Sequence, residues 1–165
     1  MYRVAILTIS DKGSQGLRED RSGPEIREIV TRQGYQVVCA MMLPDEFEQI
    51  RDVICDLCDR GTCDLLLTTG GTGFAPRDVT PEATLAAGER VVPGIPEAMR
   101  AYSMTITPRG MLSRGAAVIR NGTLVVNLPG SVKAVRENLE YILPTLEHGL
   151  AILTGRDGEC GQQPE

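Results

Sequence analysis

The sequence predicts a three-layer α/β domain, in which helices cover both faces of a mostly parallel sheet and an antiparallel hairpin lies at one edge. Apolar segments of strand length alternate with amphipathic segments of helix length along the chain. The expected strands at residues 4–10 and 64–69 are rich in continuous apolar runs, which are typical of strands covered on both faces. Asn121-Gly122, between two further apolar runs, is a strong signal for a tight hairpin turn.

The alternation defines the individual elements. We expect strands at residues 4–10, 35–42, 64–69, 115–120 and 123–127, and helices at residues 24–34, 47–60, 82–88, 97–103 and 132–153. Residues 11–23 are polar and contain several glycines, so they should form a loop, and Pro24 then suits the first turn of a helix. Asp45, Thr80 and Ser131 are placed to cap the helices that follow them.

Length and composition favour one ordinary domain. The chain has 165 residues, of which 42% are hydrophobic and 24% are charged, close to the globular average. No run approaches the ~20 apolar residues that a membrane-spanning helix requires, and the apolar run at residues 4–9 is too short for a signal sequence. We therefore expect a single domain over residues 1–154, a flexible polar tail over residues 155–165, and a cytoplasmic location.

The charge balance excludes two classes of partner. The formal net charge is −5, so the chain lacks the positive field that draws proteins to nucleic acids or anionic membranes. It has four Tyr, two Phe and no Trp, which leaves little for stacking on bases. We expect neither a nucleic acid nor a membrane as a partner.

The five cysteines are an odd number, and we interpret them as reduced thiols. Cys55, Cys58 and Cys63 could suggest metal or redox chemistry, but Cys55 and Cys58 fall on the apolar stripe of the helix expected at residues 47–60. A zinc site would need a second pair or a nearby histidine, and the single histidine, His148, lies far along the chain in the last helix. We therefore expect these thiols to belong to the core.

Four candidate loops follow expected strands. They contain Ser10-Asp11, Asp45, residues 70–78 and residues 127–131. Because small-molecule sites in α/β sheets lie at the carboxyl ends of the strands, we expect these loops to meet at one edge of the sheet and to form the functional site.

The loop Gly70-Gly71-Thr72-Gly73 ends a buried strand abruptly. Its glycines permit positive φ and a close backbone approach, so that successive N–H groups can point into one concavity, as in a phosphate cradle. The loop matches neither a Walker A motif nor a dinucleotide fingerprint. Taken alone, it is equally compatible with a tight turn that binds nothing.

Asp45 and Asp78 come from different loops and could share one Mg²⁺ with substrate phosphates, because Mg²⁺ prefers carboxylate and water oxygens. The alternative for both residues is the capping of helices. The segment 127–131 opens a helix whose free N–H groups attract anions, although an ordinary capped helix is the alternative. Ser113-Arg114 offers a hydroxyl and a guanidinium before the hairpin, and without other information this pair reads as exposed surface.

Taken together, these segments resemble the molybdopterin-binding, MogA/MoaB-like family. The most specific matches are TTGGTG at residues 68–73 and RDVTPEA at residues 77–83. Supporting matches are ISD at 9–11, DRSGP at 20–24, LPDE at 43–46, MLSR at 111–114 and NLPGS at 127–131. The matches occur in the family's order over roughly residues 4–150, and they are most similar to the MogA type, which is also seen as one domain of gephyrin.

The resemblance implies Mg²⁺-dependent transfer of AMP from ATP to the terminal phosphate of molybdopterin. It assigns catalysis to Asp45, Asp78 and Ser113, Mg²⁺ binding to Asp45 and Asp78, nucleotide binding to Ser10, Asp11, Gly70, Gly71, Thr72 and Gly73, and molybdopterin binding to Ser113, Arg114, Asn127, Pro129, Gly130 and Ser131.

The resemblance also implies a homotrimer, or a hexamer as in MoaB-like members, and the molybdate-inserting enzyme of the same pathway as a partner. Two alternatives stay open. The chain could be a MoaB-like molybdopterin-binding or assembly protein with little turnover, or a nucleotide hydrolase such as the larger pyrophosphatase-like proteins that contain a related domain.

Overall fold

A six-stranded sheet forms the middle of the molecule, with the strands in the order β2-β1-β3-β6-β5-β4. The computed structural model describes residues 1–156. The strands are β1 (Arg3–Ile9), β2 (Gln36–Leu43), β3 (Leu65–Thr69), β4 (Arg90–Val91), β5 (Ala117–Arg120) and β6 (Thr123–Leu128). Strands β2, β1, β3 and β6 pair in parallel, whereas β5 is antiparallel to both β6 and β4.

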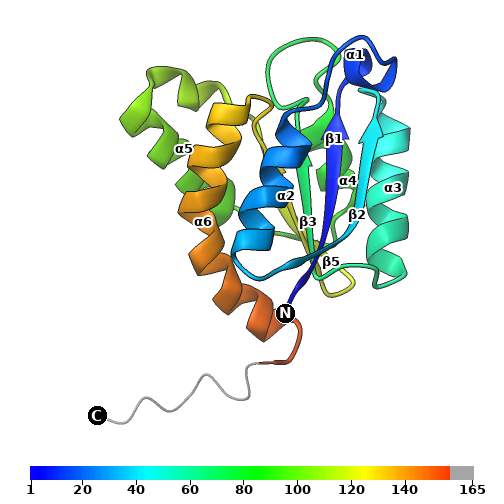
Figure 1. Ribbon diagram of the computed structural model, residues 1–165, viewed down its shortest axis with the longest axis vertical. Coiled ribbons are helices and arrows are strands. Elements are labelled where there is room, and N and C mark those ends of the chain that lie inside the picture. Colours follow the sequence, from blue (N-terminus) through cyan, green and yellow to red (C-terminus); the bar gives the residue numbers. More distant parts are fainter. Residues whose placement is uncertain (157–165) are drawn as a thin grey trace.

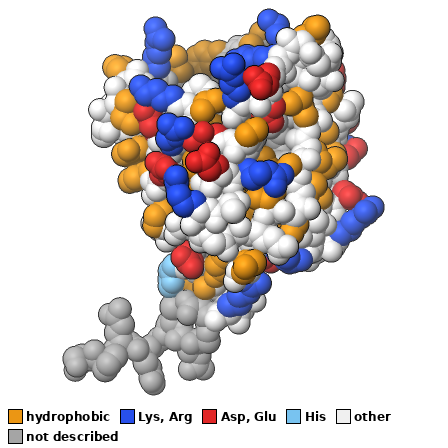
Figure 2. Space-filling model, in the orientation of Figure 1, with side chains coloured by type: hydrophobic (Ala, Val, Ile, Leu, Met, Phe, Trp, Pro, Cys, Tyr) orange, Lys and Arg blue, Asp and Glu red, His pale blue; other side chains and the backbone are white. Residues whose placement is uncertain are grey.

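Helices lie on both faces of this sheet, which confirms the expected three layers (Figure 1). The helices are α1 (Asp11–Ser14), α2 (Ser22–Arg32), α3 (Phe47–Asp59), α4 (Thr80–Ala87), α5 (Gly94–Ile106) and α6 (Val132–Leu153), with a 3-10 helix, η1, at Pro108–Leu112. Helices α2, α5 and α6 pack on one face, and α3 and α4 pack on the other. On the outer surface of α2 and α6, basic and acidic side chains lie next to one another (Figure 2).

The central strands are buried on both faces because alternate side chains serve two different cores. In β1, Ile6 belongs to the core under α2 and α6, while Leu7 belongs to the core under α3 and α4. In β3, Leu65 and Leu67 face the first core and Leu66 faces the second. The continuous apolar runs in the sequence therefore correspond to strands with two covered faces, as expected.

The predicted hairpin is present, and a short strand that the sequence did not reveal lies outside it. Asn121 and Gly122 have φ values of 43° and 78°, as a two-residue hairpin turn requires. Strand β4 pairs with β5 at the edge of the sheet. Its two residues are too few to show any periodicity in the sequence.

Several helix boundaries differ from those expected. Residues 11–23 are not wholly a loop, because Ser10 caps α1 by accepting a hydrogen bond from the Gly13 N–H. Helix α2 begins at Ser22, before Pro24, and the Asp20 carboxylate accepts from the Gly23 N–H in its first turn. The remaining boundary differences are in α4, which begins at Thr80 with Val79 at the N-cap position, and in α5, which is longer than expected at Gly94–Ile106.

The expected core position of the cysteines is confirmed for Cys58 and Cys63, which are 0% and 2% exposed. Burial raises the pKa of Cys58 to about 11 and the pKa of Cys63 to about 12. Cys55 is half-buried and packs against the same core. Within residues 1–156 no group of three or more His, Cys, Asp or Glu side chains is arranged to hold a metal ion.

The first and last described residues, Met1 and Arg156, meet at the amino ends of the parallel strands. Arg156, inside the tail expected at residues 155–165, donates to the Met1 carbonyl and lies over the Tyr2 ring. The rest of that tail, from residue 157 onward, lies outside the described residues. No helix within residues 1–156 has the length and apolar character needed to cross a membrane.

Asn127 connects three elements beneath the site edge of the sheet. Its side chain is buried in β6, where Oδ1 accepts from the Ala116 N–H at 3.0 Å. Its Nδ2 donates to Thr68 Oγ1 of β3 at 3.0 Å and to Thr84 Oγ1 of α4 at 2.8 Å. Every donor and acceptor of this amide is therefore engaged within the protein, in a structural role.

We predict that Asn127→Ala lowers the free energy of unfolding by about 1–3 kcal/mol or more, because it leaves buried polar partners unsatisfied. Urea unfolding measures this change, and Gln49→Ala, which removes an exposed amide on α3, is the control. Wild-type stability of Asn127→Ala combined with weaker ligand binding would contradict the structural role.

Candidate functional site

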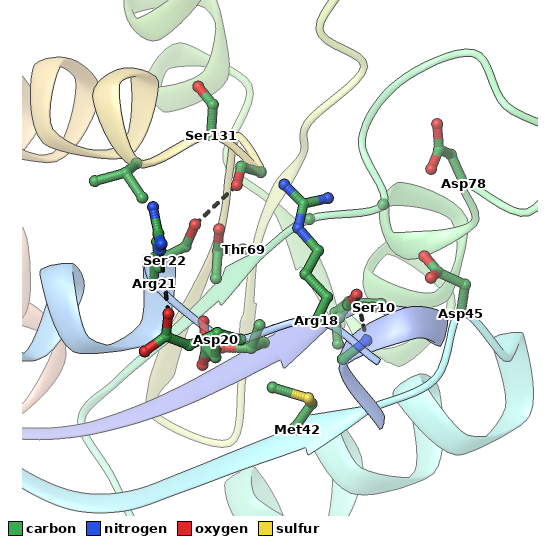
Figure 3. Close-up of a pocket in the computed structure, with 18 residues that line it drawn as sticks. Ser10, Arg18, Asp20, Arg21, Ser22, Met42, Asp45, Thr69, Asp78 and Ser131 are labelled. Atoms are coloured by element: carbon green, nitrogen blue, oxygen red, sulfur yellow. Dashed lines mark hydrogen bonds and ion pairs between the residues drawn. The ribbon is translucent and has the colours of Figure 1, made fainter. Parts of the chain in front are cut away.

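A large concavity lies where β1, β2 and β3 end and where α2 and α6 begin (Figure 3). It has a volume of about 760 Å³. Its walls are formed by Thr8, Ile9, Ser10, Gly13, Arg18, Glu19, Asp20, Arg21, Ser22, Met42, Asp45, Thr69, Gly70, Gly71, Asp78, Gly130, Ser131 and Val132. The loops therefore meet at one edge of the sheet, as the sequence predicts.

A smaller cavity of about 270 Å³ adjoins this pocket between α2 and β2. Thr8, Asp20 and Met42 line both spaces, so the two are adjacent. The smaller cavity adds apolar wall from strand β2 and a guanidinium from Arg27. Together the two spaces offer room for more than one small ligand.

The structure brings only part of the predicted residues into the pocket wall. Those in the wall are Ser10, Asp45, Gly70, Gly71, Asp78, Gly130 and Ser131. Those outside it are Asp11, Thr72, Gly73, Ser113, Arg114, Asn127 and Pro129. Two residues of the second group bond directly to residues of the first, Asp11 to Asp45 and Arg114 to Asp78.

The glycine loop is held against two neighbouring elements. Gly70 and Gly71 have φ values of 96° and 67°, which other residues rarely adopt. A Cβ at Gly70 would collide with the carbonyl of Ile9, at the end of β1. A Cβ at Gly71 would collide with Thr80 Oγ1 and come within 3.0 Å of Asp45 Oδ1. The backbone of this loop therefore reaches the Asp45 carboxylate only because both positions lack side chains.

Arg114 fixes the far part of the same loop. Its Nε donates to the Gly73 carbonyl at 2.7 Å, its Nη2 donates to the Asp78 carbonyl at 2.7 Å, and its Nη1 pairs with Glu82. The Asp78 Oδ2 also accepts from the Ala75 N–H at 2.9 Å, so Asp78 stabilises its own turn and does not cap α4. The structure thus places the Arg114 guanidinium on the loop, outside the pocket wall.

Asp45 and Asp11 are joined by two hydrogen bonds, each from the backbone N–H of one residue to the carboxylate of the other. The Asp11 N–H donates to Asp45 Oδ2 at 2.9 Å, and the Asp45 N–H donates to Asp11 Oδ1 at 3.0 Å. The expected capping role of Asp45 is wrong, because Glu46 occupies the N-cap position of α3 and Asp45 is bonded to Asp11. The Asp11 carboxylate is used in this pair and in a contact with Arg77, which explains why it lies outside the pocket wall.

The second oxygen of Asp45 has an unusual environment. Asp45 Oδ1 and Thr80 Oγ1 are both buried, and neither has a hydrogen-bond partner within residues 1–156. Burial raises the pKa of Asp45 above its ordinary value, and the nearby charges of Asp11 and Asp78 raise that pKa further. A cation beside this oxygen would satisfy it and would favour the ionised form.

The opposite wall consists of two helix starts. Ser22 Oγ donates to the Gly130 carbonyl at 2.8 Å, and Thr69 Oγ1 donates to the Pro129 carbonyl at 2.6 Å. Ser131 caps α6, as expected, by accepting from the Ala134 N–H at 3.2 Å. The amino-terminal ends of α2 and α6 therefore face the same space, and such ends attract anions.

Sequence reasoning assigned no site role to the segment between α1 and α2, which supplies Arg18, Glu19, Asp20 and Arg21 to the wall, although Asp20 and Arg21 begin the DRSGP match. In Figure 3 the Arg18 side chain rises between Ser131 and the carboxylates of Asp45 and Asp78. Arg18 has no hydrogen bond or ion pair with other residues in the described part of the chain. The only signal in the sequence was a basic residue within a polar, glycine-containing loop.

Ser113 lies behind the glycine loop. It follows η1, and its Oγ accepts from the Gly115 N–H at 3.4 Å. The next residue, Arg114, donates its N–H to the Thr72 carbonyl at 3.0 Å. The expected catalytic and molybdopterin-binding roles of Ser113 stay predictions, because this hydroxyl is outside the wall of the pocket.

The pocket can therefore hold anions on one side and a cation on the other. The amides of the helix starts and the Arg18 guanidinium offer donors to phosphate. Asp45 and Asp78 offer carboxylate oxygens, one of them buried and unpartnered. An anionic ligand beside two carboxylates needs a positive ion between them, which is the arrangement of a metal-assisted phosphate reaction.

Comparison with known proteins agrees with this site. A family model described as a probable molybdopterin binding domain matches residues 5–148. Gephyrin of Dictyostelium discoideum is 45% identical in an alignment 163 residues long, gaps included, that covers 93% of this chain and 23% of gephyrin. The chain thus spans less than a quarter of that relative. The molybdopterin adenylyltransferase of Helicobacter pylori strain J99 is 38% identical in an alignment 159 residues long, gaps included, that covers 92% of this chain and 88% of that protein.

A solved structure supports the same assignment. The molybdopterin biosynthesis enzyme MoaB from Thermus thermophilus has a TM-score of 0.89 at 48% sequence identity, over 94% of this chain and 98% of that chain. The chain therefore belongs to the family of probable molybdopterin-binding domains, as its motifs predict.

Proposed function

We propose that this protein transfers AMP from ATP to the terminal phosphate of molybdopterin in the synthesis of the molybdenum cofactor. The observation that carries the proposal is a pocket in which Asp45 and Asp78 stand across from Arg18 and two helix starts. The family assignment and the Helicobacter pylori relative, which is named a molybdopterin adenylyltransferase, support the same reaction.

The residues present fit Mg²⁺. Asp45 Oδ1 is buried without a partner, and Asp78 lies in the same wall. Because residues 1–156 contain no grouped set of three or more metal-binding side chains, phosphate oxygens and water would complete the octahedral shell that Mg²⁺ prefers. Mg²⁺ would supply the charge neutralisation that lets two phosphorylated substrates approach each other.

In this reaction the protein aligns the phosphates of the two substrates and screens their negative charge. The Gly70–Gly71 loop and the starts of α2 and α6 orient the phosphates, and Arg18 offsets their charge. The terminal phosphate of molybdopterin forms a bond to the α-phosphorus of ATP, and the bond between that phosphorus and pyrophosphate breaks. A phosphate monoester is already largely ionised at pH 7, so no general base is required. The single histidine, His148, accordingly lies on α6 outside the pocket wall.

We infer the oligomeric state and the cellular location of the protein from its family. We propose a homotrimer, with a hexamer as the alternative, that works in the cytoplasm and passes its product to the molybdate-inserting enzyme. Exposed apolar side chains on and beside α5 and η1, among them Met104, Ile106, Met111 and Leu112, are consistent with burial between subunits.

A second candidate is a MoaB-like molybdopterin-binding or assembly protein with little turnover. The observation that favours it is the 48% identity to the Thermus thermophilus protein titled MoaB. The two candidates differ in whether the pocket must bind ATP with Mg²⁺.

Replacing either carboxylate tests the proposed reaction. We expect Asp45→Asn and Asp78→Asn each to slow pyrophosphate release by about a hundredfold or more, since the lost charge supplies on the order of a few kcal/mol in the transition state. Release is measured with molybdopterin and Mg·ATP, and Asp56→Asn, in an exposed α3 ion pair, is the control. Near-normal rates in both variants would rule out the metal assignment.

Heat stability distinguishes the two candidates. A ligand that binds only the native state raises the melting temperature. At a concentration of 100 times its Kd, it adds ~2.7 kcal/mol to the free energy of unfolding. We expect millimolar ATP to raise the melting temperature with Mg²⁺ present and to do so less in EDTA. A shift with molybdopterin but none with Mg·ATP would instead favour the binding protein.

Arg18 tests the anion side of the pocket. We expect Arg18→Ala to raise the KM for ATP or molybdopterin by about tenfold, because a hydrogen bond to a charged group contributes ~1.5–3 kcal/mol. Arg18→Lys should recover part of the loss, and Arg90→Ala, on the edge strand β4, should change nothing. Unchanged KM values in Arg18→Ala would show that the guanidinium does not contact substrate.

A further inference from the structure

Arg77 connects the ends of three strands on the outside of the pocket. It lies in the loop after β3 and contacts Asp11, after β1, and Glu46, after β2. Its Nε donates to Asp11 Oδ2 at 2.9 Å and its Nη2 donates to Asp11 Oδ1 at 2.9 Å, a bidentate pair. The same Nη2 donates to Glu46 Oε1 at 2.8 Å. A planar guanidinium is suited to this fixed two-point contact, which the single point charge of a lysine cannot reproduce.

Asp11 transmits this contact to Asp45. One Asp11 oxygen that Arg77 holds, Oδ1, also accepts the Asp45 N–H at 3.0 Å. In return the Asp11 N–H binds Asp45 Oδ2 at 2.9 Å. The chain Arg77–Asp11–Asp45 therefore engages one carboxylate oxygen of Asp45 and leaves the other, Oδ1, buried and without a partner. Rotation of the Asp45 carboxyl would break a bond at the Asp11 end.

We propose that Arg77 is a positioning residue for the pocket, which through Asp11 holds the Asp45 carboxylate with its free oxygen available to a bound cation. The proposal rests on the proposed function, in which that oxygen contributes to binding of Mg·ATP. Arg77 itself is absent from the pocket wall, so it acts through Asp11 and not on the substrate.

The exposure of Arg77 separates this role from a role in folding. Its side chain is 53% exposed, and ion pairs this exposed contribute little to stability. Residues that orient a metal ligand, by contrast, typically change metal affinity or activity by about 10–100-fold when they are replaced. A large loss of function with little loss of stability is therefore the signature of the proposed role.

Arg136 offers a matched control. It also forms a bidentate pair, with Glu25, at 2.7 Å and 3.1 Å, and its side chain is 58% exposed. This pair joins α6 to α2 on the outside of the molecule and does not contact the pocket wall. Arg136→Gln thus removes the same kind of interaction without touching the Asp11–Asp45 pair.

The first experiment measures ATP binding by calorimetry, with Mg²⁺ and with EDTA, in the full-length chain. We expect Arg77→Gln to weaken binding by about 10–100-fold with Mg²⁺, to change it little in EDTA, and to keep the melting temperature near that of Arg136→Gln. Arg77→Lys should recover only part of the loss. In an Asp45→Asn background Arg77→Gln should add no further loss, because the two residues act in one chain.

The second experiment needs no ligand. Hydrogen exchange followed by NMR should show that Arg77→Gln reduces protection of the Asp11 and Asp45 amide protons, while amides in α2 and α6 keep theirs. Arg136→Gln should leave both aspartate amides protected. Failure of the wild-type protein to bind Mg·ATP would count against the proposed function alone, since the exchange data still test the positioning.

Either of two results would overturn the inference. One is an equal loss of Mg·ATP affinity from Arg77→Gln in the wild-type and Asp45→Asn backgrounds, which would make the two residues independent. The other is unchanged protection of the Asp11 and Asp45 amides in Arg77→Gln, which would show that the guanidinium does not hold the pair.

Discussion

The close approach of the Gly70–Gly71 backbone to its neighbours is the constraint on which the site depends. A side chain at either position would strike the end of β1 or the start of α4. Because the loop can sit this deep, it brings the end of β3 against Asp45 at the end of β2 and leaves Asp78 on the same side of the pocket. The ends of β1, β2 and β3 already pair in the sheet, and this bend brings the loop that follows β3 up to the Asp45 carboxylate that follows β2.

The charges of the site are arranged on two sides. Carboxylates crowd the side formed by β2 and the glycine loop, where burial and mutual repulsion raise the pKa of Asp45. Helix starts and a guanidinium form the other side. Within residues 1–156, Asp45 Oδ1 on one side and the Arg18 guanidinium on the other have no partner. A cation would stabilise the first and a phosphate the second. Arg77 and Arg114 lie outside and hold the loops in this arrangement.

The sequence predicted the features that local chemistry determines. Continuous apolar runs identified β1 and β3, Asn121-Gly122 identified the hairpin, and Gly70-Gly71 identified the loop. It could not show which polar residues turn inward. Asn127, near the end of β6, is buried against Thr68 and Thr84, and Arg114, which was expected to bind molybdopterin, bonds to the glycine loop. The Asp11–Asp45 pair and the position of Arg18 arise only when three strand ends come together.

The two edge strands of the sheet differ in how many residues another polypeptide could pair with. The outermost strand on one side, β4, is only two residues long, so an intruding segment would find almost no main chain to extend. The opposite border, β2, runs for eight residues, of which only Leu43 is buried. Of the two edge strands, only β2 is therefore long enough to pair with a foreign strand, as happens in amyloid-like growth. Charged or proline substitutions in β2 would guard against such pairing.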